Sequence, residues 1–411
     1  MSEWKTVKVG DVFSATKGYG LSKDKILVGG AYECILYGDL YTQYSEVIKE
    51  VVNSTNHKDG VLSQLDDILI PCSTTTTAID LATASVIKKK DVQLGGDITI
   101  LRSKKGNLTD GEFFAYYLTN KKKNELAEYG QGITIVHLYY NHFKDMEIDL
   151  PPLAEQQRIA RVLGDIDDEI ATLEELVAKK RLVKTAVMQQ LLTGKVRLTA
   201  DGRAVTGADI ERERQLGHLH NWRRVKLGEI GEIAMCKRIM KHQTSETGEI
   251  PFYKIGTFGE APDAFITREI FDRYSAMYKY PNKGDILLSA AGTIGRAVVF
   301  DGKPAYFQDS NIVWLQNNEK IVSNKFLAYV YKRVKWTTSD TTISRLYNDL
   351  LSNIEIFIPT DKSEQTRIAD ILTDIDDDIA IHETLISKKR RVKTGVMQQL
   401  LTGKTRLLEA A

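Results

Sequence analysis

The sequence predicts an α+β protein in which two mixed α/β globular domains are separated by two long helices, packed as an antiparallel coiled coil. Three observations lead to this prediction. A block of 44 residues occurs twice in the 411-residue chain, both copies carry the apolar spacing of a helix, and the segment before each copy contains short apolar runs typical of strands. The same observations predict a pseudo-two-fold internal repeat.

The repeat divides the chain into five segments. We expect globular domains at residues 1–150 and 221–358, helical regions at 151–198 and 359–411, and a linker at 199–220. The linker is polar, and Asp201-Gly202 and Gly207 interrupt it. A chain of this length supports domains that bury their own cores without disulfides or structural metals.

Both globular domains are predicted to be mixed α/β. Their apolar runs are short, rich in Ile and Val and flanked by Gly or Asp, as strands are. The predicted strands are Asp67–Pro71, Ala84–Ile87, Asp97–Leu101, Asp285–Ser289, Ala297–Phe300 and Ile312–Leu315, and the predicted short helices are Gly111–Thr119 and Asn324–Val334. The two domains are also weakly similar to each other, with Trp4 matching Trp222 and Asp67-Ile68-Leu69 matching Asp285-Ile286-Leu287.

Each helical region is predicted to be one uninterrupted helix. The first copy of the block starts at Glu155 and the second at Glu364, and 31 of their 44 positions are identical at an offset of 209 residues. Proline precedes each copy, a Thr-Gly-Lys sequence lies near its end, and no proline lies within it. Proline suits the start of a helix, and glycine suits the left-handed turn that ends one.

Apolar residues at spacings of three and four form one narrow stripe on each helix. The stripe comprises Ile159, Leu163, Ile166, Ile170, Leu173, Val177, Val187 and Leu191 in the first copy, and Ile368, Leu372, Ile375, Ile379, Ile386, Val396 and Leu400 in the second. A lone helix cannot bury such a stripe, so we expect the two copies to pack on each other. Four lysines (180, 184, 389 and 393) interrupt the stripe. The seam therefore either shifts to Leu176 and Val183 or opens towards a partner.

Composition excludes several classes of protein. The net charge of +1 argues neither for nor against nucleic acid, so a DNA-binding surface must come from local clustering. The three cysteines, Cys34, Cys72 and Cys236, are scattered, which predicts neither a disulfide framework nor a zinc site. The N-terminus lacks the apolar region of a secretory signal, and no apolar run approaches the roughly 20 residues that cross a bilayer. We expect a protein of a reducing, cytoplasmic compartment.

No motif for catalysis or metal binding is recognisable. Leu150-Pro151-Pro152-Leu153 lacks the Asn or Asp and the aromatic residue of an amino-methyltransferase motif, and Thr193-Gly194-Lys195-Val196 lacks the upstream glycine and the hydroxyl of a P-loop. Two acidic runs, within 165–169 and 374–378, are expected on an exposed flank of each helix rather than around a metal ion. The sequence predicts a chain without catalytic residues and without a metal site.

Both copies of the repeated block contain EQ-x-RIA, a D-I-D-D run and K-T-x-V-M-Q-Q-L-L-T-G-K-x-R-L. In these motifs the block closely resembles the conserved helical regions of the specificity subunit of type I restriction–modification enzymes. Strings in the globular domains are similar to the same family, namely Tyr37-Gly38-Asp39-Leu40-Tyr41-Thr42-Gln43-Tyr44, Leu94-Gly95-Gly96-Asp97, Gly130-Gln131-Gly132, Val136-His137-Leu138-Tyr139, Asp285-Ile286-Leu287-Leu288-Ser289 and Gly292-Thr293-Ile294-Gly295. The resemblance covers essentially the whole chain.

The resemblance implies a non-catalytic subunit that binds double-stranded DNA sequence-specifically. Each globular domain is implied to be a target recognition domain for one half of a bipartite, asymmetric site, and the helices are implied to set the spacer. The implied partners are two modification (methyltransferase) subunits, which dock on the helices, and two restriction subunits, which are ATP-dependent translocases and nucleases. S-adenosylmethionine, ATP and Mg are expected in these partners and no cofactor in this chain. A coiled-coil scaffold without DNA specificity is the alternative.

Candidate DNA contacts are polar residues on loops, because such side chains reach base edges in the major groove. In the first domain they are Lys17, Tyr19, Tyr41, Thr42, Gln43, Ser73, Thr74, Thr75 and Thr76. In the second domain they are Lys237, Arg238, Lys241, Thr293, Arg296 and Arg345. Two alternatives stay open: the hydroxyl run that starts at Ser73 is also typical of a polar turn, and Arg296 also suits an ion pair with a carboxylate.

Candidate contacts to the partner subunits are basic residues of the two helical regions. They are Arg158, Lys180, Lys184, Arg367, Lys389 and Lys393.

Overall fold

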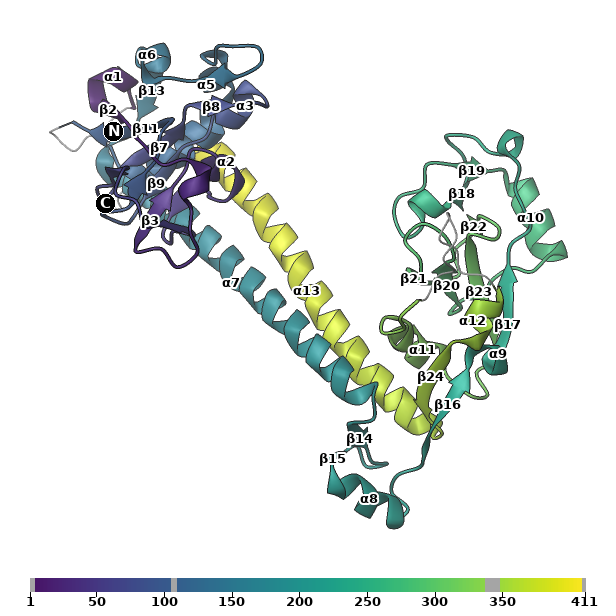
Figure 1. Ribbon diagram of the computed structural model, residues 1–411. Coiled ribbons are helices and arrows are strands. Elements are labelled where there is room, and N and C mark those ends of the chain that lie inside the picture. The colour runs from purple at the N-terminus through teal and green to yellow at the C-terminus, as the bar shows by residue number, and fades with distance from the viewer. Residues whose placement is uncertain (1–3, 105–108, 337–347, 409–411) are drawn as a thin grey trace. The chain divides into compact units, whose positions relative to one another are not determined.

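The computed structural model describes residues 4–104, 109–336 and 348–408 (Figure 1). The chain forms two compact units. Unit 1 comprises Met1–Glu175 and Thr384–Ala411, and unit 2 comprises Leu176–Glu383. Each unit therefore combines a globular part with one section of each long helix.

The two long helices are α7 (Leu153–Leu191) and α13 (Lys362–Leu400), as the repeat predicts. Both lack internal proline, and Gly194 and Gly403 follow them with positive φ angles of 71° and 68°. The helices pack together and run antiparallel within each unit (Figure 1). In unit 1, for example, Lys389 lies against Glu169 whereas Lys393, one turn later, lies against the earlier residue Asp167.

The globular part of unit 1 is built on two main sheets. One has five strands in the order β2-β11-β7-β9-β4, and the other has four in the order β5-β3-β10-β6. Two-stranded sheets β1-β13 and β12-β8 complete the part. The strands are β1 (Lys5–Lys8), β2 (Phe13–Lys17), β3 (Tyr32–Ile35), β4 (Val47–Ile48), β5 (Asn53–Thr55), β6 (Val61–Leu62), β7 (Ile68–Pro71), β8 (Ser73–Thr74), β9 (Ser85–Ile87), β10 (Gln93–Leu94), β11 (Ile98–Ser103), β12 (Val136–His137) and β13 (Glu147–Leu150).

Short helices connect the strands of unit 1. They are α1 (Val9–Val12), η1 (Lys23–Lys25), α2 (Asp39–Thr42), α3 (Ala78–Leu81), α4 (Gly111–Tyr116), η2 (Tyr117–Lys121), α5 (Lys123–Glu128) and α6 (Tyr140–Phe143). The core contains the aromatic residues of α4 and also residues of both long helices, Ile159 and Leu163 from α7 and Leu400 from α13. The long helices are therefore part of the domain core.

The globular part of unit 2 has the same plan. Its larger sheet has the order β17-β23-β20-β21, its second sheet has the order β19-β18-β22, and β16 pairs with β24. The strands are β14 (Val196–Leu198), β15 (Ala204–Thr206), β16 (Trp222–Lys226), β17 (Gly231–Met235), β18 (Ile250–Tyr253), β19 (Phe265–Ile266), β20 (Ile286–Ser289), β21 (Ala297–Val299), β22 (Tyr306–Phe307), β23 (Ile312–Asn317) and β24 (Glu355–Pro359). The predicted linker folds as the β14-β15 hairpin followed by helix α8 (Ala208–Gln215).

The remaining helices of unit 2 are α9 (Leu227–Ile230), η3 (Lys241–Gln243), η4 (Ile255–Thr257), α10 (Arg268–Met277), α11 (Asn324–Tyr331) and α12 (Asn348–Asn353). The core of this unit again takes residues from both long helices, Leu191 from α7 and Ile368 and Leu372 from α13.

The repeat extends through the globular parts, as the weak sequence similarity predicts. β7 and β20 occupy equivalent central positions in the sheet orders β2-β11-β7-β9 and β17-β23-β20-β21. Parallel pairs occur in the second sheet of each unit, β3 with β10 in unit 1 and β18 with β22 in unit 2, and unit 1 also has the parallel pair β4 with β9. All six predicted strands and both predicted short helices form, with boundaries shifted by a few residues.

The predicted shift of the helix seam to Leu176 and Val183 is wrong. Their exposed fractions are 37% and 56%, whereas Val177 is only 6% exposed. The seam instead continues along the original stripe, where Ile170 and Ile379 are also buried. The lysines that interrupt the stripe do not displace it, because acidic residues of the other helix meet them within each unit.

Candidate functional site

Four of the predicted DNA contacts of unit 1 line one cavity. Lys17 and Tyr19 come from the end of β2 and the loop after it, and Thr42 and Gln43 from the end of α2. The cavity has a volume of about 990 Å³, and its wall also includes Tyr37 and parts of the loop before β11. Tyr41, a fifth candidate from the same run, packs against the domain core instead.

One buried carboxylate organises the wall of this cavity. Asp39 is 7% exposed and starts helix α2. It accepts hydrogen bonds from the Leu36 backbone N–H at 2.8 Å, the Gln43 side-chain amide at 3.1 Å and the Asn53 side-chain amide at 3.0 Å. A buried carboxylate needs such donors, because an unsatisfied one is costly. Sequence analysis did not single out Asp39 and Asn53, although Asp39 belongs to a string noted for its family resemblance.

A second polar network lies beside the cavity. The Lys17 ammonium is 2.9 Å from Asp97, and this hydrogen bond raises the pKa of Lys17. The Ser73 hydroxyl lies 3.1 Å from both Asp97 and Nδ1 of His137, and the Tyr139 hydroxyl lies 3.1 Å from the same nitrogen. The network therefore connects the loops of β2, β8, β11 and β12. Sequence analysis missed Asp97, His137 and Tyr139 as site residues.

The first residues of the hydroxyl run are buried and the later ones are exposed. Ser73 and Thr74 form β8 and are 5% and 3% exposed. Thr74 and Thr76 share a hydrogen bond of 2.8 Å, and Thr76 donates to Asp80 at 2.6 Å. The polar-turn interpretation therefore describes much of this segment, and Thr75 and Thr76 remain on the surface for a DNA contact.

The thiol next to the hydroxyl run is inert. Burial raises the pKa of Cys72 to about 11, so that the side chain stays a neutral thiol near neutral pH. Its sulfur lies 3.1 Å from the Thr99 hydroxyl. A buried, protonated cysteine packs as a small apolar residue and is not a nucleophile.

In unit 2 the basic candidates at 237, 238 and 241 follow strand β17. The Lys237 ammonium lies 5.1 Å from the centre of the Tyr278 ring, and Arg238 pairs with Asp309 at 2.7 Å. Lys241 starts helix η3 and is exposed. All three side chains are exposed. Lys237 and Arg238 already contact Tyr278 and Asp309, so only part of the interaction capacity of these two side chains remains for DNA.

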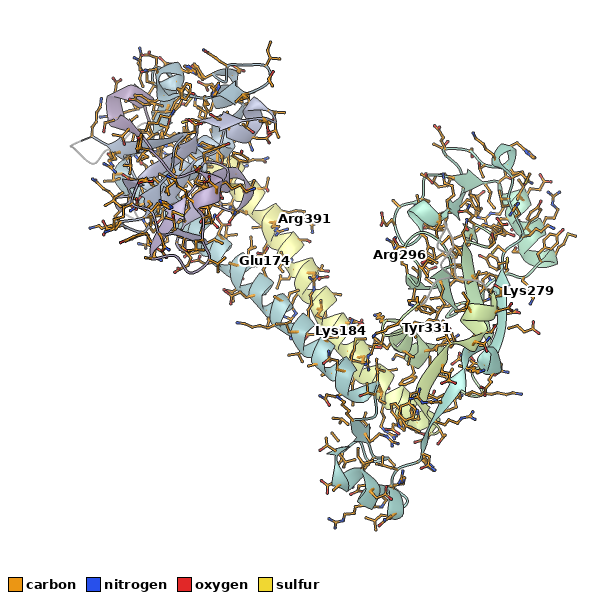
Figure 2. The ribbon with its side chains drawn as sticks, viewed as in Figure 1. Glu174, Lys184, Lys279, Arg296, Tyr331 and Arg391 are labelled. Atoms are coloured by element: carbon orange, nitrogen blue, oxygen red, sulfur yellow. The ribbon has the colours of Figure 1, made fainter. Side chains whose placement is uncertain are left out.

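The turn before β21 carries the other described candidates of unit 2. Thr293 is exposed, and Arg296 donates to the Phe258 carbonyl at 2.6 Å and lies 3.2 Å from Glu260 (Figure 2). The alternative of a carboxylate partner for Arg296 is therefore confirmed. Gly295 has a φ angle of 82°, and a side chain there would collide with Trp336, so the turn requires glycine. Arg345 lies outside the described residues.

The four lysines predicted to contact partners form ion pairs between the helices. In unit 2, Lys180 pairs with Asp378, and Lys184, which is labelled in Figure 2, pairs with Asp376. In unit 1, the equivalent pairs are Lys389 with Glu169 at 2.6 Å and Lys393 with Asp167 at 2.8 Å. The expectation that the acidic runs lie on an exposed flank is therefore wrong for Asp167 and Asp376, which are partly buried at the helix pair.

A tyrosine from each globular part completes these ion pairs. In unit 1, the Tyr116 hydroxyl donates to Asp167 at 2.6 Å. In unit 2, the Tyr329 hydroxyl donates to Asp376 at 3.0 Å. Burial raises the pKa of Asp376, but the hydrogen bonds from Lys184 and Tyr329 outweigh this effect and lower it overall.

Arg158 and Arg367, the other predicted partner contacts, hold the segments that follow the helices. Arg158 donates to the Leu407 carbonyl at 2.7 Å in unit 1, and Arg367 donates to the Leu198 carbonyl at 3.3 Å in unit 2. Beside them, the buried Glu155 and Glu364 receive two hydrogen bonds each from Arg406 and Arg197. Sequence analysis missed these two arginine–glutamate pairs, although the repeat contains both.

Apolar side chains are left exposed on the helix pairs of both units. Leu176, Leu182 and Val183 are 37%, 71% and 56% exposed on α7 in unit 2. Leu385 and Val392 are 37% and 46% exposed on α13 in unit 1, at an offset of 209 residues from Leu176 and Val183. Exposed apolar residues that recur at equivalent positions are typical of a surface that binds protein.

Within residues 4–104, 109–336 and 348–408, no three His, Cys, Asp or Glu side chains come together in a group fit for a metal ion. None of the helices described there has the length and apolarity to span a membrane.

The sequence profile of the type I restriction modification DNA specificity domain matches residues 1–180 and 220–388. A putative type I restriction enzyme specificity subunit of Haemophilus influenzae is 57% identical over 149 residues, which are 36% of this chain and 38% of that relative. The type I restriction enzyme MjaVIII specificity subunit of Methanocaldococcus jannaschii is 25% identical over 98% of this chain and 93% of its own length.

Solved structures of similar fold cover nearly the whole chain. The type I restriction–modification S subunit of M. genitalium has a TM-score of 0.62 and 17% identity, over 97% of this chain and 96% of its own. A chain from a study of complex assembly and conformational transition in a type I R-M system has a TM-score of 0.54 and 16% identity, over 97% of each chain. The likeness to these two structures concerns the fold.

Proposed function

Because this chain belongs to the type I restriction modification DNA specificity family, we propose that its two units read the two halves of one bipartite, asymmetric DNA site. The chain is a specificity subunit of a type I restriction–modification enzyme. Its role is to select the DNA sequence on which the enzyme acts.

The internal repeat is the main support for this assignment. The strand order β2-β11-β7-β9 of unit 1 recurs in unit 2 as β17-β23-β20-β21, and the two helical blocks are identical at 31 of 44 positions, whereas the loops around the sheets differ. Two recognition surfaces of different sequence suit two different half-sites. Two near-identical helical blocks suit one kind of partner that binds twice, because equivalent surfaces bind equivalent ligands.

The partners that we propose are two modification subunits, with two restriction subunits in the complete endonuclease. The exposed apolar residues Leu176 and Val183, and their equivalents Leu385 and Val392, support docking of the modification subunits on the helix pairs. The lysines of the helix pairs are occupied by acidic residues of the chain itself, so a partner contact by Lys184 or Lys393 would be additional to these pairs.

We place all catalysis and all cofactors in the partner subunits. S-adenosylmethionine is bound by the modification subunits, and ATP and Mg by the restriction subunits. The chain itself acts by binding, in the cytoplasm, where the DNA lies and where its buried free cysteines stay reduced.

The test is a map of methylated adenines in the genomic DNA of cells that express this chain with its modification subunit. The expected result is a bipartite, asymmetric motif with a fixed spacer that disappears when this chain is deleted. A scaffold without DNA specificity predicts no motif and no salt-sensitive binding of the complex to duplex DNA. That result, with an active modification subunit, would contradict the proposal.

A further inference from the structure

We propose that Gln43 reads an adenine in the half-site bound by unit 1, in an orientation that the buried Asp39 fixes. The inference rests on the proposed function, because it names the residue through which one half-site is read. Gln43 is exposed at the end of α2 and lines the cavity of unit 1, whereas Asp39 lies beneath it and acts as a positioning residue.

The orientation follows from the chemistry of the two groups. A carboxylate only accepts hydrogen bonds, so the atom of Gln43 that lies 3.1 Å from Oδ1 of Asp39 is the amide nitrogen. The other carboxylate oxygen takes the Leu36 backbone N–H and the Asn53 amide, which prevents Asp39 from turning. Rotation of the Gln43 amide by half a turn would bring two oxygens together and is unfavourable.

This arrangement leaves Gln43 with a defined set of available hydrogen-bonding groups. One N–H of the amide is bound to Asp39, so one N–H donor and the carbonyl acceptor remain. Among residues 4–104, 109–336 and 348–408, no side chain or backbone group donates to that carbonyl within hydrogen-bond distance. Asn53 is bound to the same carboxylate through its nitrogen, and its amide oxygen likewise has no donor among those residues.

A fixed donor and acceptor side by side match adenine. In the major groove adenine presents the N7 acceptor and the N6 amino donor, and glutamine pairs with both. Guanine presents two acceptors, and one of them would face the carbonyl of Gln43. Because Asp39 prevents the amide from turning over, the site discriminates against guanine more strongly than a freely rotating glutamine would.

The surroundings of Gln43 suit a nucleic acid. Tyr19 and Tyr37 also line the cavity and are 73% and 38% exposed, so aromatic surface is available to the sugar and base. Lys23 lines the cavity as well, and no carboxylate among the described residues lies within 4 Å of its ammonium. A free ammonium at the edge of a base-reading site is suited to a phosphate contact, which positions the protein on DNA without sequence preference.

The test is the methylation map of cells that express the full chain with its modification subunit, compared for the wild type, Gln43→Ala, Asp39→Asn and the control Gln64→Ala. Gln64 is an exposed glutamine of the same unit that does not line this cavity. We expect Gln43→Ala to relax one adenine position of one half-site, with a loss of about ten- to hundredfold in the preference for adenine. The other half-site, the spacer and the Gln64→Ala motif should stay unchanged.

The Asp39→Asn variant distinguishes a role of Asp39 in orienting Gln43 from a role in the folding of unit 1. An asparagine at 39 can donate as well as accept, so Gln43 is free to turn over, and we expect the same base position to accept guanine. General misfolding of unit 1 would instead abolish methylation at every site. A wild-type bipartite motif that both variants leave intact would overturn this inference while leaving the proposed function in place, whereas the lack of any wild-type motif would contradict the proposed function itself.

Discussion

At the scale of single residues, the two buried glutamates that begin the repeated blocks stand out. Glu155 and Glu364 are each 1% exposed, and each receives a bidentate arginine from the Thr-Gly-Lys-x-Arg segment that follows the other helix. Two parallel hydrogen bonds to a carboxylate are strong and specific for arginine. These pairs therefore fix the end of one helix to the start of the other within each unit.

Loss of either arginine should destabilise its unit. Arg197→Ala leaves the buried Glu364 without its partner, and we expect a loss of about 3–5 kcal/mol in the free energy of unfolding. Arg406→Ala should cost less, because the Arg406 side chain is 27% exposed and that of Arg197 only 6%. Denaturant unfolding of the full chain measures both.

Two further variants serve as controls for these losses. Arg197→Lys should recover only part of the stability, since lysine cannot bind both oxygens in one plane. Arg224→Ala should have no measurable effect, since its pair with Glu355 is exposed on both sides. Equal losses at Arg197 and Arg224 would contradict the role given to the buried pair.

The pair in unit 1 should also make the protein sensitive to acid. Hydrogen bonds from Arg406 lower the pKa of Glu155 below its ordinary value of 4.5. A lowered pKa contributes stability that is complete above the ordinary value and is lost as the pH falls through the lowered one. The difference in stability between the wild type and Glu155→Gln should therefore be constant near pH 6 to 7 and should shrink below about pH 4.5. Thermal unfolding over this pH range tests it, and a difference that grows on acidification would refute it.

At the scale of elements, the helix pairs combine apolar and charged contacts. Ile170, Val177, Ile379 and Ile386 are buried between the helices, and the ion pairs of Lys180, Lys184, Lys389 and Lys393 lie among them. Charged pairs at a helix seam fix register and orientation at some cost in stability. The ion pairs of α7 and α13 thus specify which residues of the two stripes meet.

Reversal of one charge in such a pair should weaken the helix pair, and reversal of both should restore it. We expect Lys184→Glu and Asp376→Lys each to lower the free energy of unfolding, and the double variant to recover about 1–2 kcal/mol through their coupling. A double-mutant cycle by denaturant unfolding measures this coupling. The exposed pair of Lys325 and Asp370 is the matched control, for which we expect little coupling.

The helices were largely predictable from the sequence, and the cavity was not. The stripe and the flanking Pro and Gly residues define α7 and α13 because helix formation depends on local spacing. The cavity instead depends on the meeting of the β2 loop, α2 and the loop before β11, which are far apart in the chain. The sequence therefore indicated Lys17 and Gln43 as separate polar loop residues but not Asp39, the carboxylate that binds Gln43.

The difference between local spacing and long-range contacts also explains why the ion pairs of the helix lysines were not predicted. Lys184 and Lys393 were assigned to a partner surface because each interrupts an apolar stripe. Their acidic partners, Asp376 and Asp167, lie 192 and 226 positions away in the sequence. Only the antiparallel register brings them together, and that register is a property of the folded chain.

At the scale of the whole molecule, the repeat gives the chain two equivalent apolar surfaces. Leu176 and Val183 belong to unit 2, and Leu385 and Val392 belong to unit 1. If each surface binds one modification subunit, Leu176→Glu with Val183→Glu should reduce the number of bound modification subunits from two to one. Leu385→Glu with Val392→Glu should do the same, and all four substitutions together should abolish binding. Native mass spectrometry of the assembled complex counts the subunits.

Unchanged stoichiometry in these variants, with normal unfolding curves, would place the docking surface elsewhere. Thr185→Glu, at an exposed position of α7 two residues after Val183, is the control for a negative charge as such.

The two units differ in the number of chain segments that form them. Unit 2 is one continuous stretch, Leu176–Glu383, whereas unit 1 needs both Met1–Glu175 and Thr384–Ala411. During synthesis on the ribosome, every residue of unit 2 emerges before Leu400, Leu401 and Arg406, which complete the core of unit 1 and pair with Glu155. The globular part that is translated first is therefore completed after unit 2, and the nascent chain carries an incomplete amino-terminal core until the codons for Leu400, Leu401 and Arg406 have been read.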